Sequence, residues 1–298
     1  MRFFFWRRPQ TNTVETARSR RWVWLGGHRI LTNTPYVMPK DKLEGDRLDL
    51  QHHLLKLAAG GNYRAPIRQP RDILDVACGT GTWGREMAQE FKRARVIGFD
   101  IDPTLPERAM EVLGPGGQFP PNFRFQVADA LKPFPFADGE FDFVHARLIS
   151  PFVPIARWPD VLAEMMRVLK PGGIIEVVEL EHLPESPSQA YMTLSNYGRD
   201  LMAQRGLFTG VGDALPGLLE QAGAKHIQQR KFVLGTDLRQ RRLLAADMLA
   251  AQAHVKPLMV RAGRFTEEEF DALHAQSKAE VTQLGITVPV VFCFGQKP

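Results

Sequence analysis

Short apolar runs alternate with amphipathic stretches through the middle of this 298-residue chain. Such runs predict strands, and apolar residues at helical spacing between them predict helices. The expected strands are residues 73–77, 96–99, 123–127, 141–146 and 174–180, and the expected helices are 84–91, 107–113 and 158–169. Strands that alternate with helices fold into a doubly wound α/β sheet whose strands are mostly parallel.

The last third of the chain departs from this alternation. Helices are expected over 189–205 and 214–221, followed by a strand over 227–234. A helical insertion comes next, and the chain ends in a strand over 286–294 despite Pro289. The tail is therefore an antiparallel strand pair interrupted by helices, and it completes a seven-stranded sheet.

The chain divides into three segments by composition and pattern. We expect a basic, aromatic arm over 1–40, a helical cap over 41–65 and a body over 66–298. Two insertions in the body, near 184–212 and 235–285, are expected to form helical lids.

A glycine-rich loop follows the first strand of the body. Gly79, Gly81 and Gly84 satisfy the pattern G-x-G-x-x-G, and Asp100 follows Gly81 by 19 residues at the end of the second strand. The glycines let backbone N–H groups approach a ligand, and the acid can accept hydrogen bonds from both hydroxyls of a ribose. This pattern is shared by sites for NAD, FAD and S-adenosylmethionine.

Two further acids distinguish among these cofactors. Asp75 precedes the first glycine by four residues, where its charge would repel a pyrophosphate but attract the ammonium and sulfonium of S-adenosylmethionine. Asp129 follows the third strand, where it can bond an adenine amino group. The acids therefore favour S-adenosylmethionine.

Together with the Lys170–Gly173 turn before the fifth strand and the final strand pair, these motifs resemble those of the class I S-adenosylmethionine-dependent methyltransferases. The resemblance implies a Rossmann-like fold, S-adenosylmethionine as cofactor and S-adenosylhomocysteine as product. It also implies a set of cofactor-binding residues: Asp75, Gly79, Thr80 and Gly81 at the methionine moiety, Asp100 at the ribose, Asp129 with Ala130 at the adenine amino group, and Ile101 and Leu131 on the adenine faces.

A closer resemblance covers about residues 36–234. Residues 47–53, 120–122 and 145–147 are similar to the LaeA-like methyltransferases of fungal secondary metabolism, as are Trp83, Trp158 and the 169–173 turn. Cys78 is a departure, since these enzymes usually have glycine there. Tyr36 and Arg47 resemble residues that close over the cofactor's carboxylate, with packing as the alternative.

Methyl transfer from a sulfonium is an in-line displacement, so the protein must mainly position the acceptor and exclude water. A general base is needed only where the acceptor must lose a proton. His182, just beyond the fifth strand, is the first candidate, with a loop histidine as the alternative. His145 is the second, and a structural hydrogen bond is its alternative. Arg147 fits an anionic substrate group or an ion pair with a neighbouring acid.

We expect methyl transfer to a small, largely apolar metabolite, aromatic or polyketide-like, at oxygen and in a closed pocket. Two other functions stay open. One is a regulator with this fold, or a methyltransferase of RNA or protein that uses the basic arm. The other is a membrane-surface enzyme acting on a quinone or lipid.

The net charge of +5 is concentrated in the arm. Residues 1–40 hold eight basic side chains and one acidic one, which gives +7, so the rest, with 30 basic and 32 acidic side chains, carries −2. Because the body is nearly neutral, the net charge does not indicate that the whole protein binds nucleic acid. The arm fits packing on the body or on a second copy in a homodimer, a membrane contact through residues 1–8, or a targeting role.

Cysteine usage indicates where the protein works. Cys78 and Cys293 lie far apart and match no metal spacing, so we expect a reduced, cytoplasmic protein without a bound metal. The adjacent His52 and His53 do not change this, because neighbouring residues of a helix do not face each other. The longest apolar run is far shorter than the roughly 18 residues of a membrane span.

Overall fold

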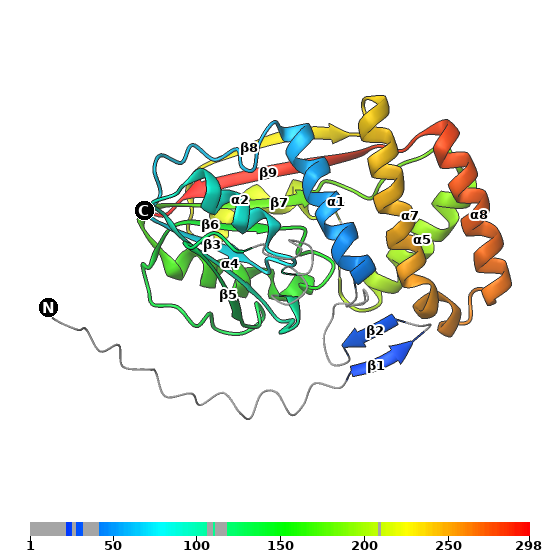
Figure 1. Ribbon diagram of the computed structural model, residues 1–298, viewed down its shortest axis with the longest axis horizontal. Coiled ribbons are helices and arrows are strands. Elements are labelled where there is room, and N and C mark those ends of the chain that lie inside the picture. Colours follow the sequence, from blue (N-terminus) through cyan, green and yellow to red (C-terminus); the bar gives the residue numbers. More distant parts are fainter. Residues whose placement is uncertain (1–21, 26–27, 32–41, 106–109, 111–117, 208–209) are drawn as a thin grey trace, which may run out of the picture.

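The computed structural model describes residues 22–25, 28–31, 42–105, 110, 118–207 and 210–298. Most of them form an α/β body around a seven-stranded sheet of order β5-β4-β3-β6-β7-β9-β8 (Figure 1). The strands are β3 Asp72–Val76, β4 Arg95–Asp100, β5 Phe123–Val127, β6 Phe141–Arg147, β7 Leu169–Leu180, β8 Lys225–Leu234 and β9 Val288–Gln296. A separate hairpin pairs β1 Trp22–Leu25 with β2 His28–Leu31.

The expected fold class is confirmed. The strands β3 to β7 are mutually parallel, whereas β9 runs antiparallel to both β7 and β8. The strand β7 begins five residues before the expected position, because Leu169 already pairs with Phe141 ahead of an irregularity in the ladder. Pro289 is tolerated as the second residue of β9, where it lies opposite Val233.

Helices cover both faces of the sheet, since neighbouring residues of β3 pack into different clusters. Ile73 packs with Trp83 and Met87 of α2 Thr82–Glu90, whereas Leu74 packs with Trp158 of α4 Trp158–Val168. The helix α6 Leu215–Gln221 packs against α4. Short 3-10 turns occupy Ile155–Arg157 and Gly212–Ala214.

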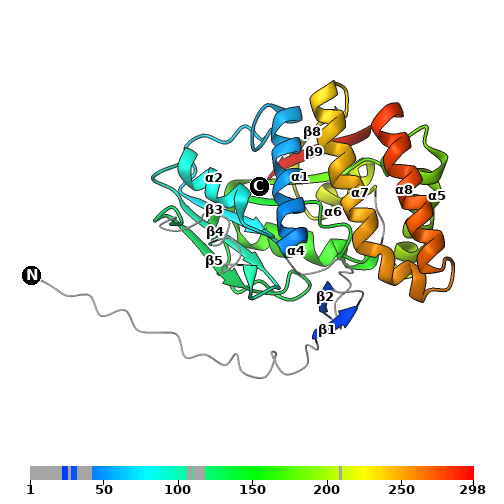
Figure 2. The ribbon, with the colours of Figure 1, turned by 45° about the vertical axis from the view of Figure 1, so that its right-hand side comes forward.

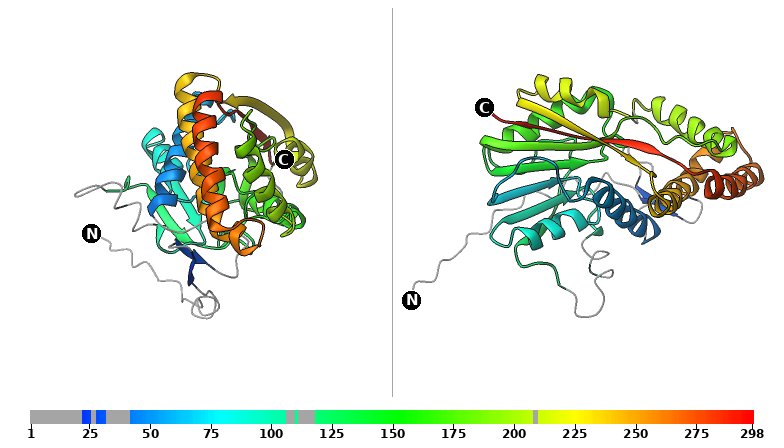
Figure 3. Two further views of the ribbon diagram at one scale, coloured as in Figure 1. Left: turned by 90° about the vertical axis from the view of Figure 1, so that its right-hand side faces the viewer. Right: turned by 90° about the horizontal axis from the view of Figure 1, so that it is seen from above.

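The remaining helices stand beside the carboxyl ends of the strands. They are α1 Lys42–Ala59, α5 Gln189–Ala203, α7 Leu238–Arg261 and α8 Glu267–Leu284. Figures 1 and 2 show α1, α7 and α8 side by side, with α7 in the middle. The view from above in Figure 3 places this helical group at one end of the sheet. The segments expected as insertions thus fold into α5 and into α7 with α8.

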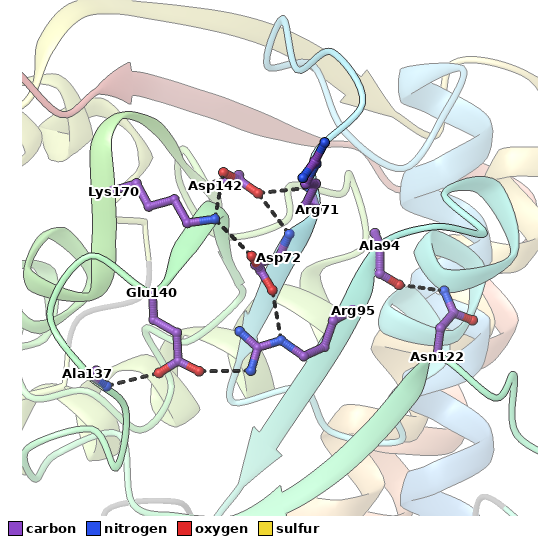
Figure 4. A network of polar contacts seen from close by, with 9 residues as sticks. All are labelled: Arg71, Asp72, Ala94, Arg95, Asn122, Ala137, Glu140, Asp142 and Lys170. Carbon is purple, nitrogen blue, oxygen red and sulfur yellow. Dashed lines mark hydrogen bonds and ion pairs between the residues drawn. The ribbon is translucent and has the colours of Figure 1, made fainter. Parts of the chain in front are cut away.

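Ion pairs hold the amino ends of the strands together (Figure 4). Lys170 donates to Asp72 on β3 at 2.8 Å and to Asp142 on β6 at 3.0 Å. Arg95 on β4 donates to Asp72 at 2.8 Å and to Glu140 at 2.9 Å. Lys170 of the 170–173 turn therefore has a structural role, at the opposite end of the strands from the site described below.

Asn122 of the 120–122 motif also has a structural role. Its amide nitrogen lies 2.8–3.2 Å from the carbonyl oxygens of Ala88, Phe91 and Ala94, around the carboxyl end of α2, and Figure 4 shows the contact with Ala94. Asn122 therefore ties the end of the helix to the turn that follows it. Among the described residues, no helix has both the length and the apolar character needed to span a membrane.

Candidate active site

A cavity of about 330 Å³ opens at the carboxyl ends of β3, β4, β5 and β6, beneath α1 and α7. Strand order reverses between β3 and β6, and a crevice at such a point is where open α/β sheets bind ligands. The strand-end loops supply Asp75, Ala77, Cys78, Gly79, Thr80, Asp100, Ile101, Asp102, Ala128, Asp129, Ala130, Leu131, Arg147, Leu148, Pro151, Phe152 and Leu180, and the helices supply Glu44, Gly45, Arg47, Leu48, Gln51, Met248 and Ala251.

The glycine loop has the backbone that its sequence predicts. Gly79 and Gly81 have φ angles of 56° and 72°, in the left-handed region that glycine adopts without strain. A Cβ on Gly81 would collide with the ring of Phe125, so a side chain is excluded there on two grounds. The amide of Gly79 donates to Asp100 at 3.1 Å, which ties the loop to the end of β4.

Cys78 replaces the glycine of the related enzymes without disturbing this turn. A Cβ added at Gly98 of β4 would lie only 2.9 Å from the Cys78 sulfur. The sulfur therefore occupies space that the missing side chain of Gly98 leaves open. Burial raises the pKa of the Cys78 thiol well above its usual range, so it stays protonated.

Asp75 is almost fully buried, and one carboxylate oxygen, Oδ2, has no hydrogen-bond partner among the described residues. The other oxygen lies 3.3 Å from Nδ1 of His145, its neighbour across the β3–β6 ladder. An unpartnered buried carboxylate oxygen is costly, so its presence at a cavity wall indicates a cationic or hydrogen-bonding ligand.

His145 supports Asp75 from below and does not line the cavity. Its ring stacks on Trp83 with centroids 3.9 Å apart, and burial lowers its pKa, so the imidazole is neutral. Its Nε2 lies 4.0 Å from Glu176 on β7. Burial raises the pKa of Glu176 to about 7, although the carboxylate accepts hydrogen bonds from the amides of Arg64 and Ala65. This geometry favours a structural hydrogen bond as the role of His145 over that of a general base.

The acids at the ends of β4 and β5 shape the next part of the cavity. Asp100 accepts hydrogen bonds from the amides of Gly79 and Asp102, at 3.1 and 3.0 Å, and so holds two loops. Asp129 accepts from the amide of Leu131 at 3.0 Å. The cavity wall thus presents Asp75, Asp100 and Asp129 in the order of the strands β3, β4 and β5.

Comparisons with known proteins agree with this architecture. The family described as methyltransferase domain matches residues 73–173. Residues 73–173 of this chain are therefore similar to a methyltransferase domain. A chain in the complex of the Haloferax volcanii Trm112 methyltransferase activator with its partner methyltransferase covers 86% of this chain and 94% of its own, with 16% identity and a TM-score of 0.53. The phosphoethanolamine N-methyltransferase 2 of Haemonchus contortus, solved with S-adenosylhomocysteine, has a TM-score of 0.50 at 18% identity and covers 85% of this chain and 52% of its own.

Relatives from fungi confirm the expected likeness to LaeA-like proteins. The secondary metabolism regulator LAE1 of Cochliobolus heterostrophus is 35% identical over 182 residues, which are 58% of this chain and 52% of that protein. Methyltransferase str3 of Strobilurus tenacellus is 31% identical over 196 residues, 64% of this chain and 66% of that protein. This chain thus spans about half to two thirds of the length of these relatives.

The methyltransferase domain has a cavity that fits S-adenosylmethionine, the cofactor of this family. The unpartnered oxygen of Asp75 suits its ammonium group, and Gly79 and Thr80 of the glycine loop line the wall where its methionine chain would lie. Asp100 lies where the ribose would be held, and Ile101, Asp129, Ala130 and Leu131 line the end expected for adenine. When bound, this cofactor supplies an electrophilic methyl group. No metal cluster of His, Cys, Asp or Glu occurs in the described part of the chain.

Arg47 lines the cavity within a buried ionic cluster that joins α1 to α7. Its guanidinium donates to both oxygens of Glu44 and to Asp247, each at 2.7 Å. His254 lies 2.9 Å from Glu44. Burial raises the pKa of Asp247, and the charge of Glu44 adds to this effect, whereas Arg47 opposes it. The expected contact of Arg47 with the cofactor's carboxylate stays a prediction, and Tyr36 lies outside the described residues.

His182 lies away from the cavity. Its side chain is 47% exposed, and its Nδ1 lies 2.8 Å from the carbonyl oxygen of Leu183. Its assignment as a base remains a prediction, and this position favours the loop alternative. Several lining residues were not expected, notably Gln51, Phe152, Met248 and Ala251. Met248 and Ala251 carry no local signal, since they are ordinary apolar positions of a long helix.

Two strand ends beside the cavity are strained. Ala77 and Leu148 have φ angles of 53° and 51°, which residues with a Cβ rarely adopt. Each follows the end of a central strand, β3 or β6. Buried Glu179 on β7 holds the second of these turns, since it accepts from the amides of Ile149 and Ser150 and from the Ser150 hydroxyl. Strain maintained by such contacts is typical of functional loops.

Proposed function

We propose that the protein transfers the methyl group of S-adenosylmethionine to oxygen of a small, largely apolar metabolite. One observation carries this proposal: besides the polar residues at the strand ends, the cavity wall has an apolar region. That region, the acceptor half, is lined by Leu48, Leu148, Pro151, Phe152, Leu180, Met248 and Ala251. Such a lining suits an aromatic or polyketide-like acceptor and excludes water from the displacement.

The remaining part of the cavity, the cofactor half, would hold S-adenosylmethionine against β3, β4 and β5. Asp75, Gly79 and Thr80, which line the cavity, would contact the methionine moiety together with the neighbouring Gly81, and Asp100 would contact the ribose. The helices α5, α7 and α8 would act as a lid, since α7 contributes Met248 and Ala251 to the cavity wall.

The relatives support a metabolite acceptor, because some are named as regulators of secondary metabolism and others as methyltransferases. They include a second methyltransferase of Strobilurus tenacellus, str2, and an N-methyltransferase of Clonostachys rogersoniana, verN. The regulator LAE1 keeps the second candidate open, a protein that binds the cofactor and acts through partners.

Calorimetry with S-adenosylhomocysteine and the wild-type chain tests the first step. We expect one site per chain, and absence of binding would contradict the proposal. A panel of aromatic and polyketide compounds is then incubated with isotopically labelled S-adenosylmethionine, and products are identified by mass spectrometry. Labelled product with an O-methyl group supports the proposal; cofactor binding without any labelled compound would favour the regulator instead.

A further inference from the structure

Arg147 is the last residue of β6, and it carries a positive charge at the cavity wall without an acidic partner in contact. Its Nη1 lies 2.7 Å from Nδ1 of His52 on α1. Within the described residues, its other nitrogens donate to no side chain or carbonyl, and no carboxylate lies within ion-pair distance. A guanidinium does not lose its proton in proteins, so this half-buried side chain remains a cation.

His52 holds Arg147 as a neutral acceptor. Burial lowers the pKa of His52, so its Nδ1 accepts the hydrogen bond from Arg147 while Nε2 carries the proton. Nε2 lies 3.2 Å from a carboxylate oxygen of Glu86 on α2, which also accepts from Lys56 at 2.6 Å. His52 thus orients the guanidinium of Arg147 without neutralising the positive charge of the guanidinium.

The acids near Arg147 act on it through their charge without contacting the guanidinium. Asp49 accepts hydrogen bonds from the hydroxyls of Thr80 and Thr82, at 2.6 Å each. Glu86 is held by Lys56, and one oxygen of Asp75 lies 3.3 Å from His145. Arg47, by contrast, donates to two carboxylates. Of the two arginines that line the cavity, Arg147 is therefore the one suited to bind an anion.

Strand order places Arg147 on the acceptor side. The expected contacts of adenine, ribose and methionine follow β5, β4 and β3 in turn. The next strand is β6, and Arg147 lies one residue beyond the last pair of the β3–β6 ladder, Val76 with Ala146. Leu148, Pro151 and Phe152 of the acceptor half follow it directly.

We propose that Arg147 binds an ionised oxygen acid of the methyl acceptor, a carboxylate or an acidic phenol, so that the substrate enters as an anion. This inference rests on the proposed function and names its substrate class. The anionic oxygen forms a bond to the methyl carbon as the carbon–sulfur bond breaks, and that electron pair stays on sulfur. One negative and one positive charge disappear, leaving a neutral methyl ester or ether and a neutral thioether.

Such an acceptor needs no general base, since it has already lost its proton. This agrees with the position of His182 outside the cavity and of His145 beneath it. Arg147 selects and orients the anion, because a guanidinium matches the two oxygens of a carboxylate in geometry and charge.

The cofactor also carries a carboxylate, so the first experiment separates the two sources. Calorimetry compares S-adenosylhomocysteine binding to the wild type, to Arg147→Gln and to a matched control, Arg230→Gln, which lies on exposed β8. We expect all three affinities to agree within about threefold. A loss of roughly tenfold or more in Arg147→Gln alone would assign Arg147 to the cofactor's carboxylate and overturn the acceptor role.

The second experiment uses probes that differ only in charge. Benzoate, 2-naphthoate and cinnamate are each compared with the corresponding primary amide, by ligand-observed NMR on protein saturated with S-adenosylhomocysteine. We expect the wild type and Arg230→Gln to prefer at least one carboxylate over its amide by roughly tenfold, and Arg147→Gln to lose that preference.

Three results would contradict the proposal: equal binding of every acid and amide, binding of none of these probes, or a preference that survives Arg147→Gln. Arg147→Lys serves as the conservative variant, and it should keep part of the preference because the charge remains. Absence of S-adenosylhomocysteine binding to the wild type would instead remove the proposed function itself, so the two failures are distinguishable.

Discussion

The two halves of the cavity are built from the chain in different ways. The cofactor half takes its residues from three consecutive strand ends, between Asp75 and Leu131. The acceptor half joins α1, the turn after β6, the end of β7 and α7, so that Leu48 and Ala251 face one space. The first half therefore depends on local motifs and the second on how distant elements pack.

The halves also differ in charge. Carboxylates line the cofactor half, in keeping with a ligand that carries a sulfonium and an ammonium group. Arg147 lies beside the acceptor half, where His52 holds it, and Arg47 lines the cavity within its carboxylate cluster. Substitutions in the acceptor half should therefore change stability and acceptor binding, whereas those in the cofactor half should change cofactor affinity.

The largest expected effect is on the packing of α1 against α7, the two helices that cover the cavity. Arg47→Met leaves Glu44 and Asp247 buried without their cation, and we expect a loss of about 3–5 kcal/mol in the free energy of unfolding. Lys42→Met on the same helix breaks a pair with Asp46 in which the side chains are 71% and 50% exposed. That control should cost about 0.5 kcal/mol or less in urea denaturation. Equal losses would mean that the cluster does not join α1 to α7.

The next effect concerns cofactor affinity. Asp100→Ala removes the expected ribose acceptor and the acceptor of the Gly79 amide, so we expect S-adenosylhomocysteine to bind less tightly by about 2–4 kcal/mol, roughly 30- to 1,000-fold. Asp138→Ala, at a side chain that is 82% exposed and outside the cavity, is the control. If Asp100→Ala changes the affinity for S-adenosylhomocysteine by less than about threefold, the assignment of Asp100 to the ribose is wrong.

A smaller effect depends on pH and concerns the turn beneath the acceptor half. Burial raises the pKa of Glu179 from 4.5 to about 7. The unfolded chain releases this proton at lower pH than the folded chain, so the contribution of Glu179 to stability is complete below about pH 4.5 and is lost as the pH rises through about 7.

Glu179→Gln removes this titration. Between pH 5 and pH 8, the stability of the wild type should fall by about 1–3 kcal/mol more than that of the variant, measured by circular dichroism during urea denaturation. Glu176, whose pKa is also raised to about 7, remains in both proteins, so the variant keeps part of the pH dependence. If the free energy of unfolding depends on pH in the same way in the two proteins, folding does not raise the pKa of Glu179.

The smallest expected effect is that of Ala251→Phe, and comparing it with Ala128→Phe tests the division of the cavity into two halves. Ala128 and Ala251 line opposite halves of the cavity, and a phenylalanine at either position would fill part of it. Ala251→Phe should leave S-adenosylhomocysteine affinity within about threefold of the wild type, whereas Ala128→Phe should prevent binding, as measured by calorimetry. If both variants bind the cofactor equally well, the two halves are not assigned to the ligands as we propose.

Residue types and their spacing predicted the succession of strands and helices along the chain. They also predicted the candidate residues of the cofactor half. Gly81 shows why: the left-handed turn between a strand and a helix depends on the glycine itself and on the strand before it. Asp75, Asp100 and Asp129 could be placed together because parallel strands end at the same edge of a sheet. Their individual roles as cofactor contacts remain predictions.

Other assignments needed the packed molecule. His145 and Arg147 leave the same strand two residues apart, yet one lies beneath Asp75 and the other lines the cavity. The sequence could not separate them, because that difference depends on Trp83 and His52, which come from two helices. Likewise, Lys170 and Asn122 belong to motifs of the resemblance but serve the amino ends of strands and the end of α2.

The sequence by itself determined the succession of strands and helices, the glycine loop and the cofactor class, because each follows from local patterns of residue types. Only the tertiary structure decided which arginine keeps an available charge. Arg47 meets Asp247 across 200 residues of sequence, and Arg147 meets His52 across 95. Contacts between such distant residues arise when helices pack on the finished sheet, and no local pattern records them.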